Sequence, residues 1–374
     1  MELREYCTYR NDRINSDELN THNYISTENL LPNKGGITEA TSIPTGNVVR
    51  YDKGNILISN IRPYFRKIWL ADKSGGCSAD VLCIQSNDKV TSKFLYYLLS
   101  QQSFFDYVMA GAKGCKMPRG DKSHIMEWNV NIPDIDEQKR IADFLSSLDD
   151  KIELNRQIND NLEQQAQALF KSWFVDFEPF GGVKPESWRY GKLKELLQLR
   201  KESVKADNVN KLPYLPIDMI PMKSLSISNF APTEEAQSSL QKFYTNDIII
   251  GAMRVYFHRV VISPCSGITR NTCFVLTPYK DYCLEYSLCV CNQNETINYA
   301  QATSKGSTMP YAVWDGGLAD MSTLIPDDVT LNSFSRIIAP IISIIRDSAF
   351  ERMKLENLRD TLLPRLMSGG LKIN

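Results

Sequence analysis

The sequence predicts an α+β protein with two similar β-rich domains, each followed by one long helix. Three observations lead to this prediction: a repeat with a period of about 190 residues, short β-branched runs in both copies, and an apolar stripe at helical spacing after each β-rich part. We expect the first domain at 1–133, the central helix at 134–178, the second domain at 179–332 and the C-terminal helix at 333–368.

The repeat is the strongest signal in the chain. Residues 56–67 have a counterpart 192 residues later, and an arginine, a Tyr-Phe pair and the basic residue after it keep their spacing in both. The matching segments are 56–67 with 248–259, 74–75 with 266–267, 113–118 with 305–310, and 3–5 with 193–195. A period of this length is far above the roughly 20–50 residues of solenoid repeats, so two copies of one domain explain it.

Within each copy, runs of β-branched and aromatic residues are broken by Gly, Pro, Asn and Ser, which is typical of strands joined by turns. We expect strands at 55–61, 81–84, 247–251 and 272–276, and short helices at 92–107 and 282–291. An Ile-Pro pair follows the β-rich part in both copies, and we expect each long helix after it.

The first long helix has a start signal and a continuous stripe. Asp134 and Asp136 suit a helix start, and Glu137 suits the first turn. Apolar residues then alternate at spacings of four and three around two asparagines, which is typical of a coiled-coil seam. The second helix is also apolar at both ends and polar in the middle, although Pro340 stands near its start. The predicted seam is formed by Ile141, Leu145, Leu148, Ile152, Asn155, Asn159, Leu162 and Leu169 with Ile337, Ile341, Ile344, Leu355, Leu358 and Leu362.

Composition excludes several classes of protein. Hydrophobic residues make up 43% and charged residues 23%, as in soluble globular proteins. The most apolar window, 337–345, is about half as long as a bilayer crossing needs, and no basic start precedes an apolar run, so we expect a cytoplasmic protein without a membrane partner. The nine cysteines include no Cys-x-x-Cys pair, and the three histidines are far apart, so we expect no metal site.

The net charge is −1, but the basic residues are clustered. Residues 53–71, 107–120 and 248–280 contain Lys and Arg and no Asp or Glu, whereas residues 134–178 contain eleven acids and five bases. Basic patches on a neutral chain are what contact with phosphate requires. The β-rich parts therefore point to nucleic acid, and the acidic helix does not.

The order of these elements resembles a known family. Residues 132–145 read IPDIDEQKRIADFL, and residues 362–369 read LLPRLMSG. Both segments resemble the helix segments of the specificity (S) subunits of type I restriction-modification complexes, and the resemblance covers essentially the whole chain. The second copy departs from the pattern, because Asp327-Asp328-Val329 stands where the first copy has its Glu-Gln pair.

The resemblance implies a recognition subunit without catalysis of its own. Each β-rich part would be a target recognition domain for one half of a bipartite site in double-stranded DNA. The two helices would pack as an antiparallel coiled coil that sets the gap between half-sites and relates the domains by a pseudo-two-fold axis. Two methyltransferase (modification) subunits and restriction/translocase subunits would be the partners. They would bind S-adenosylmethionine, ATP and Mg, and we expect no cofactor on this chain.

The sequence contains few motifs that are typical of catalytic sites. It has no Asn-Pro-Pro-aromatic element for adenine methylation and no Gly-rich cradle for ATP. Pro133-Asp134 with Glu137 and Lys139 superficially resembles a nuclease motif, but its two acids are three residues apart at a helix start, where capping explains them. Three alternatives stay open at this stage: a non-DNA coiled-coil scaffold, a stand-alone DNA methyltransferase, and a nuclease.

Candidate DNA contacts are basic and aromatic residues, since base edges and phosphates are read by such side chains on exposed loops. They are Arg62, Tyr64, Arg66, Lys67, Lys113, Lys116 and Arg119 in the first copy, and Arg254, Tyr256, His258, Arg259, Arg270 and Lys305 in the second. Glycines and a proline keep 111–120 irregular, which favours a loop. Strand aromatics such as Tyr64 and Tyr256 are more often core residues than stacking platforms, and that alternative is open for both.

Overall fold

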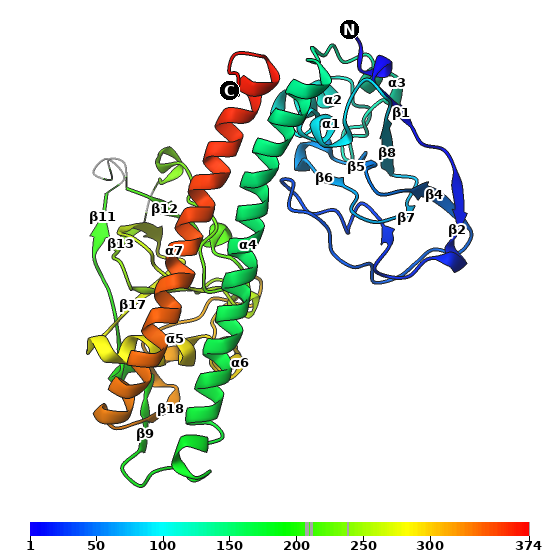
Figure 1. Ribbon diagram of the computed structural model, residues 1–374. Coiled ribbons are helices and arrows are strands. Elements are labelled where there is room, and N and C mark those ends of the chain that lie inside the picture. Colours follow the sequence, from blue (N-terminus) through cyan, green and yellow to red (C-terminus); the bar gives the residue numbers. More distant parts are fainter. Residues whose placement is uncertain (206–208, 210–211, 238, 374) are drawn as a thin grey trace. The chain divides into compact units, whose positions relative to one another are not determined.

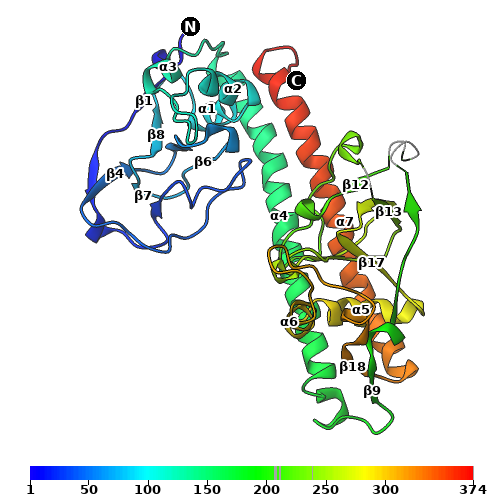
Figure 2. The same ribbon diagram turned by 180° about the vertical axis from the view of Figure 1, so that it is seen from behind.

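The protein is described by a computed structural model for residues 1–205, 209, 212–237 and 239–373 (Figures 1 and 2). It divides into two compact units, Met1–Asp149 with Asn357–Asn374 and Asp150–Glu356. Each unit contains a β-rich domain and part of both long helices. The α+β class predicted from the sequence is confirmed.

The first unit holds two sheets. One has the antiparallel order β1-β8-β5-β6, and the other has the order β2-β4-β7-β3, in which β3 is parallel to β7. The strands are β1 Cys7–Tyr9, β2 Arg13–Asn15, β3 Tyr24–Ile25, β4 Asn47–Tyr51, β5 Ile56–Ser59, β6 Ile68–Leu70, β7 Gly75–Cys77 and β8 Val81–Ser86. The helices of the domain are α1 Ser92–Leu99, α2 Gln102–Ala110 and α3 Lys122–Met126. The predicted helical region 92–107 is therefore two helices.

The second unit repeats this topology. Its sheets have the orders β10-β17-β14-β15 and β11-β13-β16-β12, again with one parallel pair, β12 with β16, and β18 pairs with β9. The strands are β9 Arg189–Lys192, β10 Leu197–Leu199, β11 Ser203–Val204, β12 Tyr214–Leu215, β13 Leu240–Phe243, β14 Ile248–Gly251, β15 Val260–Ile262, β16 Gly267–Arg270, β17 Cys273–Pro278 and β18 Ser322–Ile325. The helices are α5 Leu284–Cys291 and α6 Asn294–Ala302. The matching strand orders agree with the sequence repeat.

The central strand of each unit separates two hydrophobic cores. Alternate residues of a strand point to opposite faces of the sheet. Ile56 and Ile58 of β5 are buried in the cluster that contains α1 and α2, whereas Leu57 is buried in a second cluster on the other side. The continuous Ile-Leu-Ile and Ile-Ile-Ile runs of the two copies are therefore strands that are covered on both faces.

The Ser-Gly pair shared by the two copies has a steric reason. A Cβ on Gly75 would lie 2.0 Å from the carbonyl oxygen of Asn23, and a Cβ on Gly267 would lie 2.6 Å from that of Pro213. Glycine is required at both positions because the neighbouring backbone, which runs parallel to the strand, comes too close for a side chain.

The long helices are α4 Ile135–Phe174 and α7 Asp328–Met367. Asp134 caps α4 by accepting the amide hydrogen of Glu137 at 2.9 Å, as predicted, and Asp327 caps α7 by accepting that of Thr330 at 2.9 Å. The second helix thus begins five residues before the predicted residue 333. It continues through Pro340, which is exposed, so water can bond the carbonyl group that the missing amide leaves free.

Within each unit, the segments of α4 and α7 lie side by side (Figures 1 and 2). In the first unit, Ile141 and Leu145 of α4 are buried in one cluster with Leu363 and Leu366 of α7. In the second unit, the rings of Phe174 and Phe334 have centroids 4.8 Å apart.

Polar residues follow in the second unit. Asn155 donates to Glu351 at 2.8 Å, and Asn159 donates to the carbonyl oxygen of Ile345 at 3.1 Å. The two buried asparagines of the predicted stripe therefore contact the other helix.

The predicted seam holds for α4 and fails in part for α7. Along α4, Ile141, Leu145, Asn155 and Asn159 are buried, and Leu148, Ile152, Leu162 and Leu169 are half-buried. Along α7, Ile341, Leu355 and Leu362 are half-buried, but Ile337, Ile344 and Leu358 are 45%, 47% and 45% exposed. The buried residues are instead Phe334, Ile338, Ile342, Ile345, Ala349, Met353 and Leu363. At Ile337 and Ile344 the prediction was wrong by one residue, because adjacent isoleucine pairs satisfy either register. Leu358 has no such neighbour and is exposed.

By length and composition alone, α7 could cross a membrane. Its buried isoleucines and Phe334 belong to the hydrophobic core of the second unit. This packing buries Phe334 and these isoleucines inside the protein.

Candidate nucleic-acid interface

In the first unit, backbone hydrogen bonds fasten the loop 113–120 to the turn after β5. Arg62 donates its amide hydrogen to the carbonyl oxygen of Pro118 at 2.8 Å, and Gly120 donates to Asn60 at 3.3 Å. Lys113 and Arg119 exchange two bonds of 2.9 Å at the base of the loop. The loop is thus held at its ends by main-chain groups, and residues 113–117 are exposed.

The second unit has the same bonds 192 residues later. Arg254 donates to Pro310 at 2.8 Å, Ala312 donates to Ala252 at 2.8 Å, and the amides of Lys305 and Tyr311 exchange two bonds of 2.9 Å. The two sequence segments that match best in the repeat therefore meet in space in both units. We call each meeting point a loop crossing, which comprises residues 60–67 with 113–120, and 252–259 with 305–312.

A short 3-10 turn projects aromatic side chains from each loop crossing. The turns are η3 Pro63–Phe65 and η9 Val255–Phe257, and Tyr64 and Tyr256 are 49% and 44% exposed. The core alternative for these tyrosines is therefore not supported. The residues on both sides of each turn have positive φ values between 49° and 52°: Arg62, Arg66, Arg254 and His258. Left-handed backbone at non-glycine residues costs free energy and is found where function requires a fixed shape.

In the first unit, the candidate residues differ in their exposure and in the partners that they already have. Arg62, Lys113, Lys116 and Arg119 are exposed, and Arg119 forms a surface ion pair of 3.1 Å with Asp80. Such exposed ion pairs contribute little stability, so these side chains can exchange a partner for a phosphate.

Two further candidates of the first unit serve the fold. Arg66 donates to Asn33 at 2.7 Å and to Gln102 at 3.1 Å, and Lys67 donates to the carbonyl oxygen of Thr27 at 2.7 Å. Both side chains connect the turn to neighbouring segments, which explains their type without DNA.

In the second unit, Arg254, Tyr256, Arg270 and Lys305 are exposed. His258 is 7% exposed, and its Nε2 lies 2.9 Å from Oδ1 of Asn292, so this ring does not reach the surface as predicted.

Arg259 is also tied to the fold. It donates to the carbonyl oxygen of Ile217, and its guanidinium lies 5.3 Å from the centre of the Phe257 ring. These contacts account for Arg259 as a structural residue.

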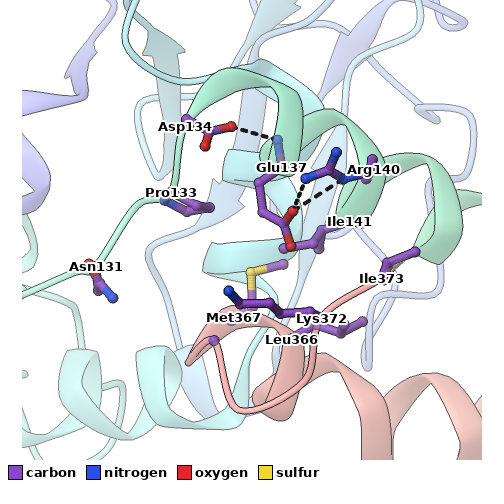
Figure 3. Close-up of a pocket in the computed structure, with 11 residues that line it drawn as sticks. Asn131, Pro133, Asp134, Glu137, Arg140, Ile141, Leu366, Met367, Lys372 and Ile373 are labelled. Atoms are coloured by element: carbon purple, nitrogen blue, oxygen red, sulfur yellow. Dashed lines mark hydrogen bonds and ion pairs between the residues drawn. The ribbon is translucent and has the colours of Figure 1, made fainter.

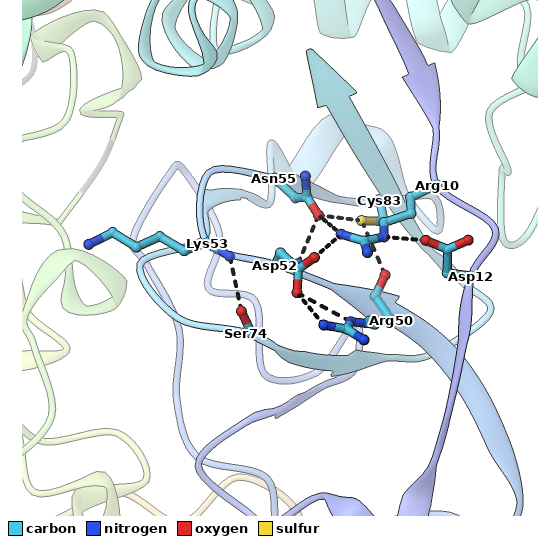
Figure 4. Close-up of polar contacts among 8 residues, drawn as sticks. All are labelled: Arg10, Asp12, Arg50, Asp52, Lys53, Asn55, Ser74 and Cys83. Atoms are coloured by element: carbon cyan, nitrogen blue, oxygen red, sulfur yellow. Dashed lines mark hydrogen bonds and ion pairs between the residues drawn. The ribbon is translucent and has the colours of Figure 1, made fainter. Parts of the chain in front are cut away.

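Sequence reasoning missed a polar network at the start of β5 in the first unit (Figure 4). Arg10, directly after β1, donates to Asp12 at 3.0 Å, to Asn55 at 3.1 Å and to Asp52. Partial burial works to raise the pKa of Asp52, but the hydrogen bonds from Arg10 lower it below its usual value. The network joins β1 to the turn that leads into β5.

The second unit has a corresponding pair. Arg200 donates to both carboxylate oxygens of Asp247, at 2.9 and 3.0 Å. The match of residues 3–5 with 193–195 at an offset of 190 places Arg10 opposite Arg200, which was the available signal.

At the start of α4, both acids of the nuclease-like motif have structural roles. Asp134 caps the helix, and Glu137 forms an ion pair with Arg140 (Figure 3). The Gln138 amide group donates to the carbonyl oxygens of Lys89 and Pro133, at 3.0 and 2.9 Å. A cavity of about 500 Å³ lies beside this helix start and is lined also by Leu366. Each acid of the motif thus has a structural partner.

Comparisons with known proteins show which family the chain resembles. Residues 1–164 match the family described as "Type I restriction modification DNA specificity domain". The chain is 27% identical over 352 residues to the type I restriction enzyme MjaIX specificity subunit of Methanocaldococcus jannaschii, covering 86% of this chain and 79% of the relative. It is 25% identical over 433 residues to the HindI specificity subunit of Haemophilus influenzae, covering 93% and 94%. Residues 1–164 thus match the specificity domain of this family, and most of the chain is similar in sequence to type I specificity subunits.

A solved structure has the same fold. The type I restriction-modification S subunit from M. genitalium superimposes with a TM-score of 0.62 at 16% identity, covering 98% of this chain and 95% of that one. At this identity, the likeness shows that the two proteins share a fold.

In this protein, polar contacts fasten each β-rich domain to the long helices. In the first unit, Lys34 donates to Asp360 at 2.8 Å, and Tyr97 donates to Asp149 at 2.7 Å. Arg359 joins the two helices by donating to Asp149 at 2.7 Å. Burial lowers the pKa of Lys34, and Arg359 nearby adds to this effect.

In the second unit, Glu163 of α4 has the corresponding role. Its Oε1 accepts hydrogen bonds of 2.9 Å from the Ser224 hydroxyl and from the Leu225 amide. Burial raises the pKa of Glu163 to about 7, although both hydrogen bonds work in the opposite direction. The loop 224–226 is therefore attached to the helix through a carboxyl group that is costly to ionise.

Proposed function

We propose that this specificity subunit reads a bipartite site in double-stranded DNA, one half with each loop crossing. The observation that carries the proposal is the pair of matched loop crossings, each with an exposed tyrosine and exposed basic residues. Arg and Lys contact phosphates and guanine, and exposed aromatic side chains can stack on bases. The residues that we assign to DNA are Arg62, Tyr64, Lys113, Lys116, Arg119, Arg254, Tyr256, Arg270 and Lys305.

We test this assignment with the complex that the chain forms with the modification subunits of its host. Lys116→Ala and Arg119→Ala should each weaken binding to the cognate duplex by about 1–3 kcal/mol and reduce the salt dependence of binding by about one phosphate contact. Lys89→Ala is the control, because Lys89 is exposed but lies outside the loop crossing. Its carbonyl oxygen accepts a hydrogen bond from Gln138 of α4. Unchanged affinity of both loop variants at physiological salt would remove this loop from the interface.

The long helices would form an antiparallel coiled coil that fixes the distance between the two DNA-reading domains. This is supported by the contacts of the start of α4 with the end of α7 in the first unit, and of the end of α4 with the start of α7 in the second. A helix of 40 residues is about 60 Å long, which exceeds the ~34 Å of one turn of B-DNA. A pseudo-two-fold axis would relate the domains.

A cysteine pair tests this pairing. Asn155→Cys with Glu351→Cys should form a disulfide within one chain on mild oxidation, because the native side chains are in contact. Leu154→Cys with Glu351→Cys is the control, since Leu154 is 48% exposed on the same turn of α4. Equal yields for both pairs would argue against the proposed packing.

Two methyltransferase subunits and restriction/translocase subunits would assemble on this chain and carry S-adenosylmethionine, ATP and Mg. Ile337 and Ile344 of α7 support a docking surface, because they lie two turns apart and are both nearly half exposed. Ile337→Glu with Ile344→Glu should reduce co-purification of the modification subunit, whereas Val329→Glu, at a position 77% exposed, should not. Full co-purification of the double variant would place the docking surface elsewhere.

A further inference from the structure

A half-open groove of about 380 Å³ lies beside the loop crossing of the second unit. Its wall and floor are formed by Met253, Arg270, Asn271, Thr272, Phe274 and Tyr311. Phe274 is buried and packs edge-on against Trp314, with ring centroids 6.1 Å apart, so the floor is rigid and apolar. Arg270, Asn271 and Tyr311 are exposed.

The wall of the groove contains a buried hydroxyl group. The Thr272 hydroxyl is buried and has no nitrogen or oxygen partner. Its side chain forms a hydrogen bond with the Cys273 thiol, and such bonds are weak because sulfur is a poor acceptor. Among the described residues that line the groove, none carries a carboxylate, so the lining offers hydrogen-bond donors on an apolar floor.

The first unit has the same backbone arrangement at this place but carries different side chains. The amide of Ala252 donates to Thr272 as that of Asn60 donates to Asp80, both at 2.8 Å, so Thr272 corresponds to Asp80. Tyr311 likewise corresponds to Arg119. In the first unit these two positions therefore hold an ion pair, Arg119 with Asp80, where the second unit has two neutral side chains.

We propose that this groove is the base-reading pocket of the second domain, and that it holds the major-groove edge of a base pair with a thymine methyl group against Met253 and Phe274. This inference rests on the proposed function. Thymine is the base that presents a methyl group beside a hydrogen-bond acceptor in the major groove. The methyl group suits the apolar floor, and its O4 suits the donors Arg270 and Asn271. Cytosine lacks this methyl group, so its edge would leave the apolar floor uncovered.

The experiment uses the complex with the host's modification subunits and randomised duplex DNA. After selection of the preferred duplex, each thymine is replaced in turn by deoxyuridine, which lacks the methyl group. One thymine in one half-site should lose about fourfold in affinity, the value expected for one buried methyl-sized group. Thr272→Asp with Tyr311→Arg gives the second domain the ion pair of the first, and it should abolish this effect and change the base selected there.

Internal controls separate the outcomes. An unchanged preference at the other half-site shows that the double variant is folded, and Tyr311→Ala provides a milder variant that should reduce the deoxyuridine effect. Tyr190→Ala, at a tyrosine 69% exposed on β9, should leave the selected sequence unchanged. If no thymine responds, or if the responding thymine behaves identically in the variants, the pocket does not read thymine. If the wild-type complex selects no sequence at all, the proposed function fails instead.

Discussion

Replacing Glu163 by glutamine should stabilise the protein at alkaline pH. Burial raises the pKa of this carboxyl group from 4.5 to about 7, and its Oε1 accepts hydrogen bonds from Ser224 and Leu225. A glutamine Oε1 can accept the same two bonds without carrying a charge. The variant therefore keeps the contact between α4 and the loop 224–226 and removes the cost of ionising a buried group.

The size of the effect follows from the pKa difference. The folded state binds more protons than the unfolded state between pH 4.5 and 7, so the free energy of unfolding falls as the pH rises through this interval. A difference of about 2.5 pKa units corresponds to about 3 kcal/mol. Glu163→Gln should therefore be more stable than the wild type by about 3 kcal/mol at pH 8 and by less than about 1 kcal/mol at pH 5.

Urea unfolding at both pH values measures this difference. Glu153→Gln on the same helix is the control, because hydrogen bonding to Arg156 lowers the pKa of Glu153. The control variant should gain no stability at pH 8. A Glu163→Gln variant with equal or lower stability than the wild type at pH 8, or with the same difference at both pH values, would refute the reasoning.

Three further predictions concern the helices. Ile338→Ala should cost about 2–5 kcal/mol of stability and Ile337→Ala less than about 1 kcal/mol, since Ile338 is fully buried and Ile337 is 45% exposed. Equal losses of stability in thermal unfolding would contradict the register assigned to α7. Arg359→Ala should cost about 3 kcal/mol by leaving Asp149 without its cation, and a variant as stable as the wild type to urea would contradict this. Asn159→Ala should cost about 1–3 kcal/mol through the loss of a buried hydrogen bond, measured by calorimetry, whereas a gain in stability would show that the bond contributes nothing.

Much of the fold could be predicted because it depends on local sequence patterns. The repeat located the segments of both loop crossings, and the acid after the first Ile-Pro pair located the start of α4, whereas the start of α7 was placed five residues too late. The register of α7 could not be predicted, because a helix with adjacent isoleucines at 337–338, 341–342 and 344–345 has two equally apolar stripes. Tertiary packing chooses between them.

The candidate site was less predictable than the fold. Arg66 and His258 occupy matching positions in sequence, yet one binds neighbouring side chains near the surface and the other is buried against Asn292. The network of Arg10 with Asp52 joins residues 42 positions apart, and no periodicity connects them. Sequence pattern locates a loop crossing, but which side chains are free depends on long-range neighbours.

The loop crossings are held by main-chain groups, and this has a consequence for how new specificities arise. Because the fastening bonds join amides and carbonyls, they are the same whether the residue is Arg119 or Tyr311. The side chains on these loops can therefore be exchanged by mutation without loosening the frame that carries them. A lineage could acquire a new recognition sequence at little cost in folding, one residue at a time, while the helices and partner surfaces stay as they are.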